Sequence, residues 1–288
     1  MSALKVEPAG KRVSKWGEGP IWHEGLLYYV DIEGHAIVSY DPNTREEKEW
    51  PVEQRVGFVV PSKSNRLLFG GDKGLFFFDT KSGSIKAIHD PEPELPDNRF
   101  NDGKCAPDGR LFAGTISLVK KEGSAKLYRL NKDLNCEVAY EPVTNSNGIV
   151  WNKVGNICYY IDTPTKTVVA FDYDPKIGSL TNKCCVVDTS FIQASPDGMA
   201  IDADDHLWVT FCHGACVIQF DPVAGKQIQK IELPCLETTA CCFGGSDLND
   251  LYVTTGIHKT EKEEFAGRLF VIRDVGAKGF AANLFADL

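Results

Sequence analysis

The chain has 288 residues, of which 43% are hydrophobic and 25% are charged, a composition typical of globular proteins rather than disordered, collagen-like or coiled-coil chains. It carries 31 Lys and Arg residues against 40 Asp and Glu residues, so its formal net charge is −9. This excess of negative charge disfavours binding to nucleic acid and to anionic membranes, and we expect small molecules or cations as partners.

Residues 1–13 mix polar and charged side chains and lack the apolar core of a secretory signal, and no later stretch approaches the roughly 18 apolar residues of a membrane span. We therefore expect a cytoplasmic protein. Its ten cysteines fall mostly inside apolar runs, which predicts reduced, buried thiols. They are Cys105, Cys136, Cys158, Cys184, Cys185, Cys212, Cys216, Cys235, Cys241 and Cys242.

Short apolar runs recur along the chain, and their first residues lie 40, 44, 47, 49 and 44 positions apart. Most are followed after a turn by a second apolar run that ends in aspartate, as at Tyr40-Asp41 and Phe220-Asp221. Repetition at this spacing is typical of repeat architectures. The six first runs are residues 27–30, 67–70, 111–114, 158–161, 207–210 and 251–254.

Helical periodicity is almost absent, and six units of 288/6 = 48 residues each leave room for four short strands. We therefore predict an all-β protein, a six-bladed β-propeller with four antiparallel strands per blade, as a single domain over residues 1–288. A parallel β-helix needs shorter repeats, and a β-sandwich does not explain six copies. Because ring closure removes exposed sheet edges, both chain ends are expected to share one blade.

Polar residues occupy equivalent positions about ten residues before the six runs. The innermost strands of a propeller line its channel, so these positions are expected to form a ring at the channel mouth. A single Asn-Gly or Asp-Gly pair is usually a turn, but four polar members in register predict a cation site. Oxygen ligands favour a hard ion such as Ca²⁺, Mg²⁺ or Mn²⁺. The ring positions are Glu18, Gly57, Asn101, Asn147, Asp197 and Thr239.

Two other segments could suggest metal binding. Residues 212–216 read Cys-His-Gly-Ala-Cys, but no second Cys or His pair follows at zinc-site spacing, so we favour a hairpin turn between two strands. Residues 202–205 read Asp-Ala-Asp-Asp but lack the central glycine and terminal glutamate of an EF-hand loop. We interpret them as a solvated turn.

Several segments together resemble the signature segments of the regucalcin (senescence marker protein), gluconolactonase and luciferin-regenerating enzyme family. The resemblance extends over residues 16–279. It implies a six-bladed propeller that binds one divalent metal ion (Ca²⁺, Zn²⁺, Mn²⁺ or Mg²⁺) and hydrolyses sugar lactones. It places the metal ligands at Glu18, Asn147 and Asp197 and the substrate-binding pair at Arg99 and Asn101. The segments are residues 17–22, 99–104, 146–148, 196–199 and 242–245.

The chain departs from the family pattern after Gly114-Thr115, where an acidic stretch is usual. Residues 116–122 read Ile-Ser-Leu-Val-Lys-Lys-Glu, so a carboxylate that would bind sugar hydroxyl groups is missing. The only acidic residue of that stretch, Glu122, is the candidate replacement. The departure concerns the substrate rather than the metal ion, because the loop is expected over the pocket.

These features favour a metal-dependent lactonase, a carboxylic ester hydrolase. A divalent ion can polarise the lactone carbonyl, Asp197 is the candidate general base, and Arg99 and Asn101 would orient the substrate. No Gly-x-Ser-x-Gly elbow, phosphate-binding loop or dinucleotide fingerprint occurs. Two alternatives are a non-catalytic calcium-binding regulator and an interaction propeller. The sequence leaves the natural lactone, the physiological metal and the oligomeric state open.

Overall fold

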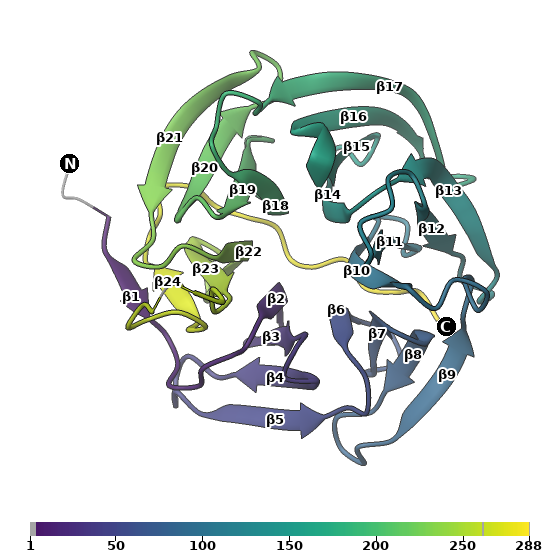
Figure 1. Ribbon diagram of the computed structural model, residues 1–288, viewed down its shortest axis with the longest axis horizontal. Helices are drawn as coiled ribbons and strands as arrows, with labels where there is room; N and C mark the ends of the chain where they lie inside the picture. The colour runs from purple at the N-terminus through teal and green to yellow at the C-terminus, as the bar shows by residue number, and fades with distance from the viewer. Residues whose placement is uncertain (1–3, 261, 288) are drawn as a thin grey trace.

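The computed structural model describes residues 4–260 and 262–287 and shows six four-stranded antiparallel sheets around a central channel (Figure 1). The predicted six-bladed β-propeller is confirmed. Within the described residues the helical content is one short turn, η1(Thr163–Thr165). None of the helical structure in that part of the chain has the length and apolar character needed to cross a membrane.

Five blades consist of four strands that are consecutive in the chain and are ordered from the channel outwards. The first blade contains β2(Gly17–His23), β3(Leu26–Asp31), β4(Ala36–Tyr40) and β5(Glu47–Pro51). The second contains β6(Val56–Pro61), β7(Leu67–Gly71), β8(Gly74–Phe78) and β9(Ile85–His89). The third contains β10(Asn98–Cys105), β11(Leu111–Ser117), β12(Ala125–Leu130) and β13(Cys136–Val143).

The fourth blade contains β14(Ser146–Trp151), β15(Ile157–Asp162), β16(Thr167–Asp174) and β17(Ser179–Asp188), with η1 between β15 and β16. The fifth contains β18(Ser195–Ile201), β19(Leu207–Cys212), β20(Cys216–Asp221) and β21(Lys226–Glu232). The sixth contains β22(Thr238–Gly244), β23(Asp250–Thr255), β24(Phe270–Ile272) and, outermost, β1(Val6–Pro8).

The sixth blade closes the ring with strands from both ends of the chain, as expected from the sequence. β1 pairs antiparallel with β24, and Val6 lies opposite Ile272. After β24 the chain leaves this blade and crosses the molecule towards the second and third blades (Figure 1). There Phe285 forms a bridge with Ser62, and the amide of Ala286 donates to the carbonyl of Gly109.

The six recurring apolar runs are the second strands of the blades. Their residues are buried on both faces because each strand lies between the two neighbouring blades, which explains why they read as continuous apolar runs. Trp208 packs edge-on against Phe243 of the next blade, with ring centroids 5.6 Å apart, and Trp22 stacks on Tyr252 at 5.7 Å. Each fully buried large apolar side chain contributes roughly 1.5–3 kcal/mol, so these contacts hold the ring together.

A β-bulge interrupts the pairing of every innermost strand at the ring position that the sequence predicted. In each case the register shifts between residues at or beside that position, so at least one inner-strand residue has no partner on the second strand. A bulge re-aims the side chains next to it, which suits positions that face the channel. The shifts lie between Glu18 and Ile21, Val56 and Phe58, Phe100 and Asp102, Asn147 and Ile149, Pro196 and Met199, and Thr238 and Ala240.

The cysteines agree only partly with the prediction. All ten lie in the described part of the chain and none forms a disulfide, but Cys184 and Cys185 are exposed and Cys136 is half-buried. The prediction that these three side chains are buried was wrong because β13 and β17 are the outermost strands of their blades. The apolar character of residues 184–187 therefore marks a strand, but one that lies at the blade edge.

Thiol titration is expected to separate these two classes. In the native protein a thiol reagent should modify Cys184 and Cys185 quickly, because burial raises the pKa of other thiols such as Cys158 and Cys241 and also excludes the reagent. After denaturation without reductant all ten should react. A count of six or fewer would contradict the assignment of free thiols.

Candidate metal and substrate site

The six ring positions follow one another around the channel mouth, each touching the next inner strand. A Cβ added to Gly57 would lie 2.6 Å from the carbonyl oxygen of Asn101, whose Nδ2 donates to Asn147 Oδ1 at 3.0 Å. A Cβ on Gly148 would lie 2.9 Å from the carbonyl oxygen of Asp197, and one on Gly198 would lie 3.0 Å from that of Thr239. Glycine at these places lets the inner strands approach closely, which brings the ring side chains together.

The three predicted metal ligands lie in this ring on three different blades. Glu18 is in β2, Asn147 in β14 and Asp197 in β18, and their exposed fractions are 6%, 3% and 7%. The ring positions Gly57 and Thr239 offer no such ligand: the Thr239 hydroxyl donates to the carbonyl of Gly17 at 2.6 Å, which ties the sixth blade to the first.

A chain of hydrogen bonds connects the predicted substrate-binding pair to the predicted ligands. Arg99 Nη1 donates to Asn101 Oδ1 at 2.8 Å, and Asn101 Nδ2 donates to Asn147 Oδ1. Asn147 Nδ2 donates to the Thr163 hydroxyl at 2.7 Å, which in turn donates to the carbonyl of Pro196 at 2.9 Å. These bonds fix the orientation of the Asn147 side-chain amide, so that its Oδ1 atom rather than its Nδ2 atom faces Asn101.

Electrostatic repulsion is strong at the mouth because several carboxylates are buried together. Desolvation and then the charge of Asp102 raise the pKa of Glu18 to about 8. Desolvation, followed by Glu18 and Asp102, also raises the pKa of Asp197 well above its ordinary value. Burial likewise raises the pKa of Asp102. Sequence reasoning missed Asp102 as a third buried carboxylate, although it directly follows the ring position Asn101.

The donor set fits a divalent cation. Buried like charges are costly without a cation between them, and Glu18, Asp197 and the amide oxygen of Asn147 are oxygen donors of the kind that hard divalent ions prefer. Sequence reasoning also missed Thr163, whose hydroxyl holds the side-chain amide of Asn147 in place. Thr163 lies in η1, where no sequence motif indicates a functional residue.

Arg99 is almost fully buried, with 8% of its surface exposed, and its Nε atom has no hydrogen-bond partner within residues 4–260 and 262–287. Desolvation lowers the pKa of Arg99 to about 10, and the nearby Arg55 adds to this effect. A buried guanidinium with a spare donor is costly unless a ligand completes its bonds. Arg99 is therefore poised to bind an oxygen-rich group.

The structure gives the candidate replacement Glu122 no contact with the mouth. Glu122 is exposed in the turn between β11 and β12. The carboxylate that lies beside Thr115 is instead Glu92, which accepts hydrogen bonds from the Thr115 hydroxyl at 3.2 Å, the Tyr128 hydroxyl at 2.9 Å and Asn98 Nδ2 at 3.0 Å. Glu92 is far from residue 122 in sequence, so a search of the loop alone could not find it.

The other two metal-like segments form turns, but Asp202 is only 1% exposed, so the turn at residues 202–205 is not the solvated one expected from the sequence. Asp202 Oδ1 accepts hydrogen bonds from the amides of Asp204 and His206, which closes the turn after β18. Residues 213–215 form the turn between β19 and β20, and His213 adopts a positive φ of 63° there.

Stability of the chelated protein is expected to fall as pH rises. With the pKa of Glu18 raised from 4.5 to about 8, the folded state holds a proton that the unfolded state releases in this window, so the free energy of unfolding decreases from pH 4.5 to 8. A divalent cation should offset this loss of stability, and its stabilising effect should be larger near pH 8 than near pH 4.5. Urea unfolding across this pH range, with chelator and with added Ca²⁺, measures the loss of stability and the effect of the cation. A free energy of unfolding that stays constant or rises with pH in the chelated protein would contradict the prediction.

The chain is similar to known proteins over most of its length. Regucalcin of Danio rerio is 37% identical over 97% of this chain and 97% of its own. A Bacillus subtilis (strain 168) protein, provisionally named sugar lactone lactonase YvrE, is 38% identical over 88% of this chain and 89% of its own. The solved structure of a luciferin-regenerating enzyme superposes with a TM-score of 0.92 at 26% identity, covering 98% of this chain and 99% of that one.

The signature segments quoted from the sequence fall within the part of the chain that a family model matches. That model is described as the SMP-30/Gluconolactonase/LRE-like region and matches residues 16–257. The match covers the innermost strand of every blade, and therefore every ring position; these strands are β2, β6, β10, β14, β18 and β22. The chain belongs to the SMP-30/Gluconolactonase/LRE-like family.

Proposed function

We propose that the chain is a divalent-metal-dependent lactonase that opens sugar lactones. The observation that supports it most is a set of groups close in space: the buried carboxylates Glu18 and Asp197 act on each other's charge, and a hydrogen-bond chain joins Asn147 to the buried Arg99. The family membership and the relative named as a sugar lactone lactonase point in the same direction.

In this proposal Glu18, Asn147 and Asp197 hold the cation by their oxygen atoms. When bound, the ion supplies Lewis-acid polarisation of the lactone carbonyl. Asp197 accepts a proton from the attacking water, because a ligand carboxylate can share its second oxygen with that water. Thr163 keeps the Asn147 amide in place and so maintains the geometry of the ring.

Substrate orientation falls to Arg99 and Asn101. The spare Nε donor of Arg99 can bind a carbonyl or hydroxyl oxygen of the lactone by a charge-assisted hydrogen bond. Asn101 contacts both Arg99 and Asn147, so it sets the distance between the bound sugar and the ligands. Because Glu122 makes no contact here, the lactone is held by a different set of groups from the family pattern.

The second candidate is a non-catalytic calcium-binding protein on the same propeller. The buried carboxylates at the mouth would bind a cation whether or not turnover follows, and several relatives are named regucalcin. This alternative gives no use for the unpartnered Nε of Arg99, so we rank it second.

Hydrolysis of a panel of sugar lactones, measured as acid release with chelator and with Ca²⁺, Zn²⁺, Mn²⁺ or Mg²⁺, tests the proposal. We expect turnover that chelator abolishes and one of the ions restores. Metal binding without turnover of any lactone would favour the calcium-binding alternative, and turnover that is unaffected by chelator would refute metal dependence.

We also propose a cytoplasmic location. Ten cysteines without a disulfide are typical of a reducing compartment, and two of them, Cys184 and Cys185, are exposed to oxidants in the surrounding solution.

A further inference from the structure

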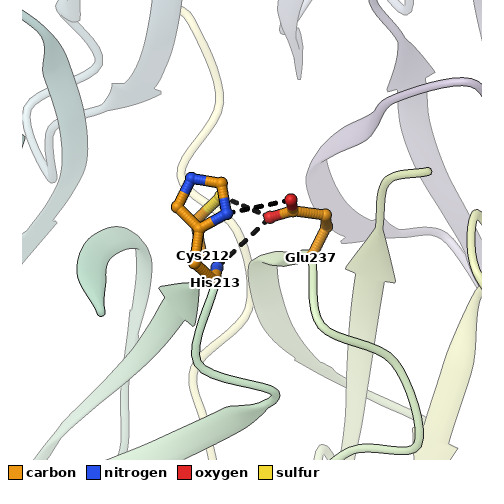
Figure 2. A group of neighbouring side chains, drawn as sticks. All are labelled: Cys212, His213 and Glu237. Atoms are coloured by element: carbon orange, nitrogen blue, oxygen red, sulfur yellow. Dashed lines mark hydrogen bonds and ion pairs between the residues drawn. The ribbon is translucent and has the colours of Figure 1, made fainter. Parts of the chain in front are cut away.

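A second group of metal-ligating side chains lies between the fifth and sixth blades, at the same mouth as Asp197 but on other residues. Cys212 ends β19, His213 begins the turn after it, and Glu237 directly precedes β22. Figure 2 shows these three side chains pointing towards one another from two neighbouring segments. One ligand atom from each lies within 4.8 Å of the others.

The distances within the group are short. Cys212 Sγ donates to Glu237 Oε2 at 3.0 Å, and His213 Nδ1 lies 2.9 Å from Glu237 Oε1. A second imidazole, that of His258 after β23, has its Nε2 atom 3.6 Å from the same Oε1. The rings of His213 and His258 meet edge to face, with centroids 6.0 Å apart. Cys212, His213 and Glu237 therefore surround one small space, and His258 lies beside Glu237 at its edge.

Glu237 sits in an environment that suits a cation. Its side chain is 1% exposed, and its ion-pair partners in the described part of the chain are the two histidines rather than a lysine or arginine. It also lies close enough to Asp197 for the two charges to repel each other. A buried carboxylate near a second one is costly unless a cation lies beside it.

We propose that Cys212, His213 and Glu237 bind a divalent transition-metal ion of the Zn²⁺ type, separate from the oxygen site of the channel, with a solvent molecule as the fourth ligand. One sulfur, one nitrogen and one oxygen donor with an open fourth position match the preferences of Zn²⁺, whose tetrahedral ligands lie about 3.2–3.8 Å apart. The Cys212–Glu237 and His213–Glu237 separations, 3.0 and 2.9 Å, lie within a few tenths of an ångström of this range. On binding, the Cys212 thiol gives its proton to solvent, and thiolate, carboxylate and M²⁺ form a neutral complex.

The surroundings also favour ligation by His213. Its side chain is 55% exposed, so an ion can reach the site from solvent. His258 Nδ1 accepts the backbone N–H of Thr260 at 3.3 Å, so in a neutral ring Nε2 carries the proton and faces Glu237 as a donor rather than as a ligand.

A second acidic group offers a useful contrast. Asp202, Asp204 and His206 also lie within ligand distance of one another, but Asp202 already accepts four N–H groups, from two backbone amides, Trp208 and Gln219. Its charge is satisfied by the turn and the core, so no cation is needed there. Glu237 accepts one backbone amide, that of His213 at 3.2 Å, and its other partners are the Cys212 thiol and two imidazoles, side chains of the kinds that bind metals, which is why the proposal concerns only its site.

Cobalt provides a direct test because a Co²⁺–thiolate bond gives a charge-transfer absorption that oxygen sites lack. The parent for the experiment is Cys184→Ser/Cys185→Ser, which removes the exposed thiols. After chelator treatment and dialysis it is titrated with Co²⁺. We expect a charge-transfer band that saturates by two equivalents, because the channel site can take up one ion without contributing to the band; Zn²⁺ should displace it, and Cys212→Ser should eliminate it.

Matched variants locate the site. Cys216→Ser, four residues along the same hairpin, and Asp197→Asn should keep the band, whereas His213→Ala should weaken Co²⁺ binding at least tenfold. If Cys212→Ser fails to fold, His213→Ala still decides the question because this side chain is mostly exposed. The proposal is overturned if the parent shows no band, if Cys212→Ser retains it, or if His213→Ala binds Co²⁺ as tightly as the parent.

Discussion

Turnover of Asp197→Asn is expected to fall by a factor of ~10² to 10⁴ at saturating metal, the usual cost of removing a general base. The substitution keeps the size of the side chain and one oxygen ligand but removes the group that accepts the proton. It also removes one negative charge from a mouth where Glu18, Asp102 and Asp197 repel one another, so cation affinity should decrease as well.

Asn147→Ala is the matched comparison. It removes a neutral ligand that cannot accept a proton, so activity should recover as the metal concentration rises. Steady-state kinetics of both variants across a metal titration separate ligation from base catalysis. Full recovery of Asp197→Asn at high metal would mean that Asp197 only holds the cation and that another group, with Asp102 the nearest buried candidate, deprotonates the water.

Arg99→Ala should lower kcat/KM for lactones by roughly 10- to 100-fold while leaving cation affinity nearly unchanged. A hydrogen bond to a charged group contributes about 1.5–3 kcal/mol, and each 1.4 kcal/mol corresponds to a factor of ten. The guanidinium cannot ligate a cation, so its loss should affect only substrate binding. Arg99→Lys should restore little, because the ammonium lacks the planar fork.

Arg66→Ala is the control for this prediction. Arg66 pairs with Asp287 at 2.9 Å and packs over Phe77, so its removal perturbs a surface ion pair away from the mouth. Calorimetric titration with Ca²⁺ and lactone kinetics should show no change for this variant. An equal loss of Ca²⁺ affinity and of activity in Arg99→Ala would contradict a substrate-binding role.

The propeller was predictable because its physical signal is repeated six times. The second strands are buried on both faces in every blade, so each appears in the sequence as an apolar run, and the spacing of the runs reveals the blades. The ring was predictable for the same reason, since Glu18, Asn147 and Asp197 occupy equivalent places before their runs. Residues that act once, in a single blade, carry no such periodic signal.

The features that were missed depend on contacts between distant segments. Asp102 acts on Glu18 and Asp197 of other blades, and Thr163 orients Asn147 from 16 positions away. Glu237 meets His213 from 24 positions away. The burial of Cys184 was mispredicted because an apolar run does not tell which strand of a blade it forms. Contacts between segments that are distant in the sequence decide these cases, and the local sequence pattern does not contain this information.

The short strand β1 has a consequence for the outer surface of the molecule. Each of the other outermost strands carries charged side chains, such as Lys48 in β5 and Lys86 in β9, which discourage edge-to-edge pairing. β24, which β1 covers, reads Phe-Val-Ile and is buried throughout. A chain that begins after Pro8 would expose this apolar edge of the sixth blade. A second copy could then add a strand to that edge, so the loss of a few N-terminal residues would make the propeller self-associate.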